Sequence, residues 1–267
     1  MSFFSESFEE VWRTRYGARP DFQGAELGAI LAHRSVRKYA ETPIPDEVLK
    51  SLILAAQSAS TSSNLQLWSV ISVQDPVRRE AITQLCADQD QVRNAPVFLA
   101  VIADLYRVDQ AARVLDFEPD GPEYMEFLLT AVVDASLAAE RMVCAAETLG
   151  IGTCYIGALR NHPDQVKELL NLPHLTFGIF GLCLGYPAES ETAKVKPRLA
   201  QEAVWFKEQY DQSVSALEYD KRMEPFFATR KLDTTWSMQT GKRLGMAYMA
   251  GRAKLLDFLQ SQGLAKK

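Results

Sequence analysis

The stretch that most constrains this chain is YMEFLLTAVVDASLAAERMVCAAETLG, residues 124–150, the segment that most resembles a membrane span. It is interrupted by five charged residues, which are Glu126, Asp134, Glu140, Arg141 and Glu147. A charged side chain at the centre of a bilayer is costly, so this stretch is too charged to cross a membrane. It instead predicts a long helix, apolar around most of its circumference, that ends at Gly150 and runs through a core or a subunit interface.

Capping signals and apolar periodicity predict two more helices, at residues 44–60 and 162–172. The first of them opens with a proline and two acidic residues, and its apolar residues recur along one face. Strands are predicted, from β-branched and aromatic content, at residues 68–75, 95–104, 153–159 and 176–187. Because helices and a few strands alternate without a strict βαβ rhythm, we expect an α+β fold rather than a doubly wound sheet.

Composition excludes several classes of protein. A chain of 267 residues, with 47% hydrophobic and 24% charged residues, is typical of a globular protein with a large core, as one domain or one domain with an arm. The net charge of −5 argues against nucleic-acid binding, because a surface that follows phosphates normally carries an excess of basic residues.

Cysteines and histidines show no metal-binding or disulfide pattern. No CxxC pair occurs among the cysteines, which are Cys86, Cys144, Cys154 and Cys183, so they indicate buried thiols in a reducing compartment. The three histidines are scattered, without the spacing of metal ligands. The opening MSFFSESFEE has no secretory pattern, and we expect a cytoplasmic protein without membrane contact.

Two basic clusters stand out from the acidic background: His33-Arg34-Ser35-Val36-Arg37-Lys38 and Lys194-Val195-Lys196-Pro197-Arg198. Each follows an element that ends nearby, which places it on a loop. Arginine offers a planar fork that suits phosphate, and lysine and serine add further donors. If the two loops meet, they form a site for a dianion; otherwise they are solvated surface charges.

Two further stretches allow two interpretations each. SASTSSNLQ (58–66) is either a helix end that runs into a turn or a set of hydroxyl groups for the polar edge of a cofactor. In LGIGTCYIGALRN (149–161), the glycine spacing and the preceding helix do not fit a dinucleotide fingerprint. Its small residues either let a flat ligand approach the strand closely or serve only a turn.

Five motifs in this order, HRSVRKY, PIPDEVLKSLILAAQSASTSSNLQ, AAETLGIGTCYIGALRN, FGLCLGYP and VKPRL, closely resemble the FMN-containing NADPH nitroreductases and flavin reductases. The resemblance is to the oxygen-insensitive NADPH nitroreductase and NADPH–flavin oxidoreductase branch. It implies an α+β homodimer with a small, mainly antiparallel central sheet flanked by helices, FMN at the dimer interface, and C-terminal arms that embrace the partner. It also implies three segments: an N-terminal extension (1–24), an FMN-binding core (25–206) and a helical C-terminal arm of the same domain (207–267).

The arm carries apolar residues that a partner subunit would most easily bury: Trp236, Leu244, Leu255, Leu256, Phe258 and Leu259. The resemblance further implies the positions that contact FMN, which are His33, Arg34, Ser35, Arg37, Ser60, Thr61, Ser62, Gln89, Tyr155, Ile156, Gly157, Ala158, Lys196 and Arg198.

Roles within this set also follow from the resemblance. Arg34, Ser35 and Arg198 are expected to bind the phosphate, while Arg37 and Lys196 are expected to face the pyrimidine edge of the flavin. The resemblance implies that the N–H of Gly157 donates to flavin N5. Ala158 stands where the family usually has a second glycine, so its methyl group could narrow the approach to the ring. Arg230 and Arg252 are the implied partners of the NADPH phosphates.

The functional hypothesis is hydride transfer from NADPH, with NADH less favoured, through flavin N5 to nitroaromatics, quinones or free flavin. One shared site would give ping-pong kinetics, and no catalytic side chain or metal is required, because the cofactor carries the chemistry. Three alternatives remain open at this point. They are a non-catalytic flavin carrier or sensor, another flavin reduction on the same scaffold, and an interaction protein with basic surface loops.

Overall fold

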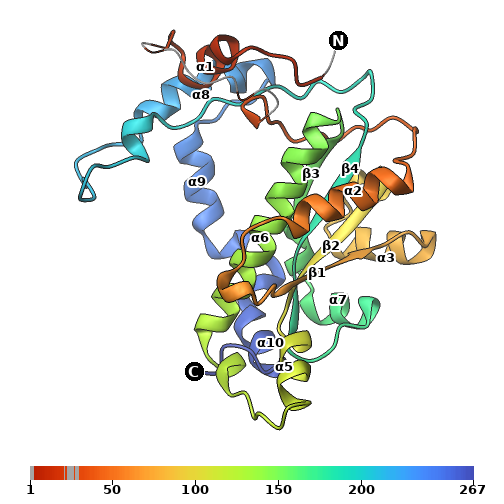
Figure 1. Ribbon diagram of the computed structural model, residues 1–267. Helices are drawn as coiled ribbons and strands as arrows, with labels where there is room; N and C mark the ends of the chain where they lie inside the picture. Colours follow the sequence, from red (N-terminus) through yellow and green to blue (C-terminus); the bar gives the residue numbers. More distant parts are fainter. Residues whose placement is uncertain (1–2, 21, 23–26, 28–29) are drawn as a thin grey trace. The chain divides into compact units, whose positions relative to one another are not determined.

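The computed structural model describes residues 3–20, 22, 27 and 30–267 (Figure 1). The chain divides into two compact units. The first consists of Met1–Arg34 and Ala193–Ala250, and the second of Ser35–Thr192 and Gly251–Lys267. Each unit is described by itself.

A four-stranded sheet forms the centre of the second unit. Its strands are β1 (Trp68–Ser72), β2 (Val97–Asp104), β3 (Gly152–Ile156) and β4 (Thr176–Gly185). They lie in the order β1-β2-β4-β3, and every neighbouring pair is antiparallel. The α+β class and the existence of the four predicted strands are therefore confirmed, but residues 157–159, predicted as strand, belong to a 3₁₀ helix that follows β3.

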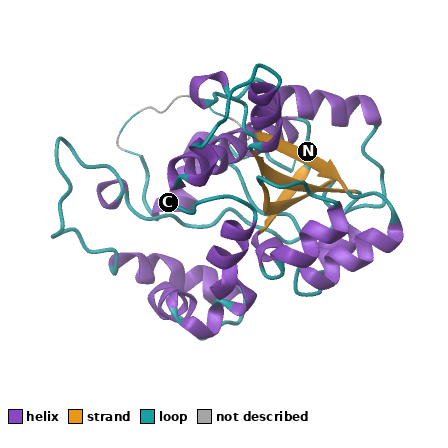
Figure 2. Cartoon of the chain, turned by 90° about the horizontal axis from the view of Figure 1, so that it is seen from below, coloured by secondary structure: helices purple, strands orange, loops and turns teal. Residues whose placement is uncertain are grey.

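Helices cover both faces of this sheet (Figure 2). One face packs against α2 (Asp46–Gln57) and α6 (Met125–Thr148), and the other packs against α3 (Pro76–Leu85), α4 (Asp90–Asn94) and α7 (Pro163–Leu170). Alternation along β2 explains the two cores, because successive side chains of a strand point to opposite faces. Leu99 and Val101 join the α6 core, while Phe98 and Ala100 join the opposite one.

Helix α6 confirms the long helix that the sequence predicts. It buries a mainly alanine face against the sheet and ends just before Gly150, which has a φ of +74°. Small side chains let the helix approach the strands closely. No helix among the described residues is long and apolar enough to cross a membrane.

The shorter elements of the second unit surround these layers. They are η2 (Ser62–Asn64), α5 (Tyr106–Arg113), η3 (Gly121–Glu123), η4 (Gly157–Arg160) and α10 (Leu255–Ser261). The 3₁₀ helix η7 (Ala250–Lys254) begins at the last residue of the first unit and continues into the second.

The first unit is helical. It contains α1 (Phe8–Tyr16), η5 (Gln201–Ala203), α8 (Glu218–Thr229), α9 (Trp236–Leu244) and η6 (Met246–Tyr248). The hydroxyl of Ser7 accepts from the N–H of Glu10, whose carboxylate accepts from the N–H of Ser7, so α1 begins with a complete capping box. Between α8 and α9, Tyr219 meets Trp236 edge to face, with ring centres 5.3 Å apart.

The end of the C-terminal arm corrects one expectation. Leu259 is buried in the core beside α6, and Leu255 and Phe258 pack against the same core, so these three side chains need no partner subunit. Trp236 packs within the first unit. Leu244 and Leu256 remain 83% and 51% exposed, and their burial by a partner stays a prediction.

Candidate functional site

The first basic cluster crosses the boundary between the units after Arg34. In the second unit, Ser35 forms a parallel bridge with Thr153, and the N–H of Val36 donates to the carbonyl of Thr153 at 2.9 Å. One carboxylate oxygen of Glu191 accepts from the N–H groups of Arg37 and Lys38, at 2.7 and 2.8 Å. The backbone of the cluster is thus fixed beside strand β3, while the Arg37 and Lys38 side chains are exposed.

The predicted ring-binding residues follow at the end of the same strand. The hydroxyl of Tyr155 donates to Glu140 on α6 at 3.0 Å, and burial raises the pKa of Tyr155 above its ordinary value. Ile156 and Ala158 belong to the core on the opposite face of the sheet, so the methyl group of Ala158 has apolar neighbours. A Cβ placed on Gly157 would lie 3.5 and 3.9 Å from the two terminal nitrogens of the Arg160 guanidinium, at ordinary van der Waals distance, so the Arg160 side chain lies beside this glycine.

A pair of arginines lies directly after this strand. Arg160 donates to the carbonyl of Ile179 at 2.5 Å, and its pKa is lowered by burial and by the nearby charge of Arg252. Arg252 in turn donates to the side chain of Asn161 at 2.9 Å. Arg252 therefore lies at the end of the motif that the sequence analysis singled out.

The predicted hydroxyl residues Ser60, Thr61 and Ser62 form part of the wall of a pocket of about 400 Å³ beside α6. The carboxylate of Asp134, which is 1% exposed, accepts from the hydroxyl of Thr61 at 2.5 Å and from the N–H of Ser62 at 2.9 Å. It also accepts from the buried N–H of Leu67 at 3.1 Å. Asp134 thus fixes Thr61 and Ser62, two of the three residues of the hydroxyl loop (residues 60–62).

Gln89, the predicted glutamine that faces the ring, is held by local contacts. Its side-chain amide donates to the carbonyl of Cys86 at 2.7 Å and accepts from Gln91 at 2.6 Å. The preceding residues Ala87 and Asp88 have positive φ angles of 62° and 51°. A non-glycine residue adopts such angles only where its surroundings hold it there.

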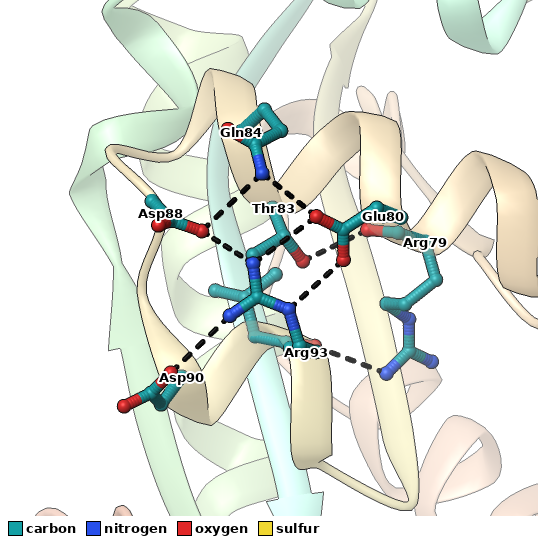
Figure 3. A network of polar contacts seen from close by, with 8 residues as sticks. Arg79, Glu80, Thr83, Gln84, Asp88, Asp90 and Arg93 are labelled. Carbon is teal, nitrogen blue, oxygen red and sulfur yellow. Dashed lines mark hydrogen bonds and ion pairs between the residues drawn. The ribbon is translucent and has the colours of Figure 1, made fainter.

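A polar network around Arg93 supplies that support (Figure 3). Arg93 forms ion pairs with Glu80, Asp88 and Asp90, so it ties α3, the turn and α4 together. Arg79 adds hydrogen bonds to backbone carbonyl groups, namely those of Val73, Val92 and Ala95.

This network should make stability depend on acid pH. The pKa of Glu80 is lowered from 4.5 to about 2, chiefly by the hydrogen bond from Arg93. A carboxylate with a depressed pKa stabilises the fold above its ordinary pKa and loses that contribution as the pH falls through the folded-state pKa. We expect Arg93→Met to unfold at a lower temperature than the natural chain at neutral pH, with the gap closing between about pH 4.5 and pH 2. Thermal unfolding followed by circular dichroism checks this; a gap that stays constant across the range would contradict it.

The second basic cluster lies in the first unit and is anchored by two helices. The N–H of Arg198 donates to the carbonyl of Arg15 on α1 at 3.0 Å. From α8, the hydroxyl of Tyr219 donates to the carbonyl of Pro197 and Arg222 donates to the carbonyl of Arg198, both at 2.7 Å. The side chain of Arg198 is left exposed, and Lys196 is half-buried.

Helix α1 also fixes the segment that leads to His33 and Arg34. The guanidinium of Arg15 donates twice to the carbonyl of Leu31, at 3.2 and 2.5 Å. Arg15 therefore joins the two predicted phosphate-binding segments of the first unit, through its side chain to one and its carbonyl to the other. Arg230, also in this unit, is exposed and lies 5.8 Å from the centre of the Phe226 ring.

Comparison with known proteins identifies the family. Residues 30–186 match the model of the nitroreductase family, and residues 196–267 match the model of its C-terminal domain. This chain belongs to the nitroreductase family. It is 38% identical over 247 residues to the NADPH-flavin oxidoreductase of Vibrio harveyi. The alignment covers 90% of this chain and 98% of that protein.

Two more relatives agree with this placement in the nitroreductase family. The FMN reductase (NADPH) of Bacillus subtilis is 34% identical over 249 residues, covering 90% of this chain and 98% of its own length. The solved structure of the NfrA1 nitroreductase from B. subtilis superposes with a TM-score of 0.82 at 34% identity, covering 89% and 98% of the two chains. The predicted family, fold and oxidoreductase class are therefore confirmed.

Several supporting residues of this nitroreductase were missed by sequence reasoning. For Asp134 the sequence did contain an indication, because a carboxylate within an apolar helix requires a hydrogen-bond partner when it is buried. Nothing in the local sequence indicated the roles of Glu191, Arg15 and Arg160, since their partners lie far away along the chain or are backbone carbonyl groups. Among the described residues, no group of three or more His, Cys, Asp or Glu side chains could hold a metal.

Proposed function

We propose that this nitroreductase is an FMN-dependent oxidoreductase that takes its electrons from NADPH. The observation that carries this proposal is the fixed course of residues 35–37 along strand β3, which brings the first basic cluster beside the strand that ends just before Gly157. The names of the two curated relatives, an NADPH-flavin oxidoreductase and an FMN reductase (NADPH), support both the cofactor and the donor.

The residues fit FMN in their chemistry. The proposed phosphate and pyrimidine ligands supply arginine forks, a lysine and hydroxyl groups, which are donors for an anion rather than ligands for a metal. Gly157 carries no side chain of its own, which suits the close approach of a flat ring to its backbone. FMN would supply hydride transfer when bound, between NADPH and a second acceptor.

Each proposed residue then has a positional role. Arg34, Ser35 and Arg198 bind the phosphate, and Arg37 and Lys196 place positive charge at the pyrimidine edge of the flavin. Remaining FMN contacts come from the hydroxyl loop and the end of β3, which are His33, Ser60, Thr61, Ser62, Gln89, Tyr155, Ile156, Gly157 and Ala158. Arg230 and Arg252 bind the phosphates of NADPH.

We also propose a homodimer, supported by an unpartnered stripe on α6. Met125, Leu129, Val133 and Leu137 recur at intervals of one turn and are 42–54% exposed. A solvent-facing row of large apolar side chains is typical of a protein interface. The stripe adjoins the pocket of Ser60, Thr61 and Ser62, which would bring the hydroxyl loop to the interface.

Nitroaromatics, quinones and free flavin are the proposed acceptors, and they would occupy the NADPH position after NADP⁺ leaves. With one shared position, double-reciprocal plots at several fixed acceptor concentrations should give parallel lines. Initial rates of NADPH oxidation with a nitroaromatic, a quinone and FMN as acceptors test this directly. Intersecting lines would show that donor and acceptor bind together, which contradicts the shared position.

A further inference from the structure

Arg34 is already enclosed by residues near the N-terminus of its own unit. Its Nη2 atom donates to a carboxylate oxygen of Glu6 at 2.5 Å. Its guanidinium carbon lies 4.9 Å from the ring centre of Phe3 and 5.4 Å from that of Phe4. Its Nε donates to the carbonyl of Ala32 at 3.1 Å, and the Arg34 side chain is only 8% exposed.

This arrangement conflicts with binding of a phosphate at the same guanidinium. Carboxylates and phosphates both use the planar fork of arginine, and both bind it through charge-assisted hydrogen bonds. A phosphate oxygen that takes the same N–H of Nη2 must therefore displace the carboxylate of Glu6, whose negative charge also opposes a phosphate beside it.

Such a displacement is feasible because Glu6 lies partly at the surface. The Glu6 side chain is 33% exposed, so water can solvate its carboxylate once it leaves. A phosphate that takes the place of the carboxylate keeps the buried guanidinium paired with an anion, so no buried charge is left without a partner. Ser7, the N-cap of α1, directly follows Glu6, so the segment before it can open while the helix remains capped.

The enclosing residues lie before the segment that matches the nitroreductase family model, which begins at residue 30. We propose that Glu6 sets the affinity for FMN by competing with the FMN phosphate for Arg34. Residues 3–6 are a cover that lies on Arg34 in the closed state and leaves it when the phosphate binds. This inference rests on the proposed function, in which Arg34 binds that phosphate.

Flavin titrations of the apoprotein test the competition. The full chain and its Glu6→Gln variant are stripped of flavin and titrated with FMN and with riboflavin, with binding followed by quenching of flavin fluorescence. Because apparent affinity scales with the fraction of protein in the open state, Glu6→Gln should bind FMN about tenfold more tightly. Riboflavin lacks the phosphate, so its affinity should not change.

Glu9→Gln is the matched control. It removes the same charge three residues further on, where the carboxylate pairs with Arg13 at 2.7 Å rather than with Arg34. It should bind FMN like the natural chain, which separates competition at Arg34 from a general loss of negative charge. Phe3→Leu, which removes a ring from Arg34 and keeps the charge, should also tighten FMN binding.

The outcomes distinguish failure of the proposed competition at Arg34 from failure of the proposed FMN-binding function. Unchanged or weaker FMN binding by Glu6→Gln overturns the competition, and weaker binding would make Glu6 a residue that holds Arg34 in place for the phosphate. Equal tightening of FMN and riboflavin overturns it too, because the effect would not involve the phosphate. If the natural chain, Glu6→Gln and Glu9→Gln all fail to bind FMN, the proposed function itself is wrong.

Discussion

Gly152→Ala is expected to lower the free energy of unfolding by about 3 kcal/mol and to weaken FMN binding at the same time. A Cβ on Gly152 would lie 2.5, 2.6 and 2.8 Å from the three side-chain carbons of Val36. Val36 is fully buried and its N–H is bonded to Thr153, so it cannot move without shifting the basic cluster on either side. The substitution would thus displace Ser35 and Arg37 from strand β3.

Urea unfolding and FMN titration of Gly152→Ala measure both effects. Gly241→Ala is the control, because a Cβ there would meet nothing within 4 Å and the residue lies inside helix α9. That variant should be more stable than the natural chain by about 0.5–1 kcal/mol, since alanine is the better helix former. An unchanged unfolding midpoint for Gly152→Ala would show that the close contact with Val36 does not constrain the site.

Asp134→Ala should destabilise the protein by about 3 kcal/mol, because it removes the acceptor of three hydrogen bonds. The N–H of Leu67 is buried and would be left without its partner, whereas Thr61 and Ser62 can turn to water. The pocket wall formed by the hydroxyl loop should lose its fixed conformation. We therefore expect weaker FMN binding together with the lower stability.

Glu126→Ala is the comparison for this second variant. Glu126 lies on the same helix and the same pocket, but it is exposed, and its bond from Thr130 is long, at 3.5 Å. Its replacement should change stability by no more than about 0.5 kcal/mol. Thermal unfolding of Asp134→Ala and Glu126→Ala measures the difference in stability between them. Equal unfolding midpoints would contradict the role given to Asp134.

Periodicity and composition predicted most of the second unit. Helix α6 and the four strands stand close to their predicted positions, because each is long or strongly patterned enough to be recognised from local sequence. The loop position of the basic clusters followed from the ends of neighbouring elements. Motif order, rather than any single motif, carried the assignment to the family.

Contacts between residues that are distant in the chain could not be predicted from local sequence patterns. Nothing near Val36 shows that Gly152 must lack a side chain, and nothing near Arg34 shows that Glu6 reaches it. The prediction that a partner buries the end of the C-terminal arm was wrong for a related reason. The apolar residues of the arm require burial, but their pattern does not say whether Leu259 packs into its own chain or into a partner. The domain boundaries at residues 24 and 206, the FMN and NADPH contacts, and the homodimer stay predictions.

An anaerobic absorption spectrum of the purified chain tests the central claim most directly. We expect a flavin spectrum in the protein as purified or after addition of FMN, and loss of the visible band when NADPH is added, with NADH less effective. Protein that binds flavin but keeps its colour with NADPH would instead be a carrier or sensor. Protein that binds no FMN would contradict the central claim, that this chain is an FMN-dependent oxidoreductase.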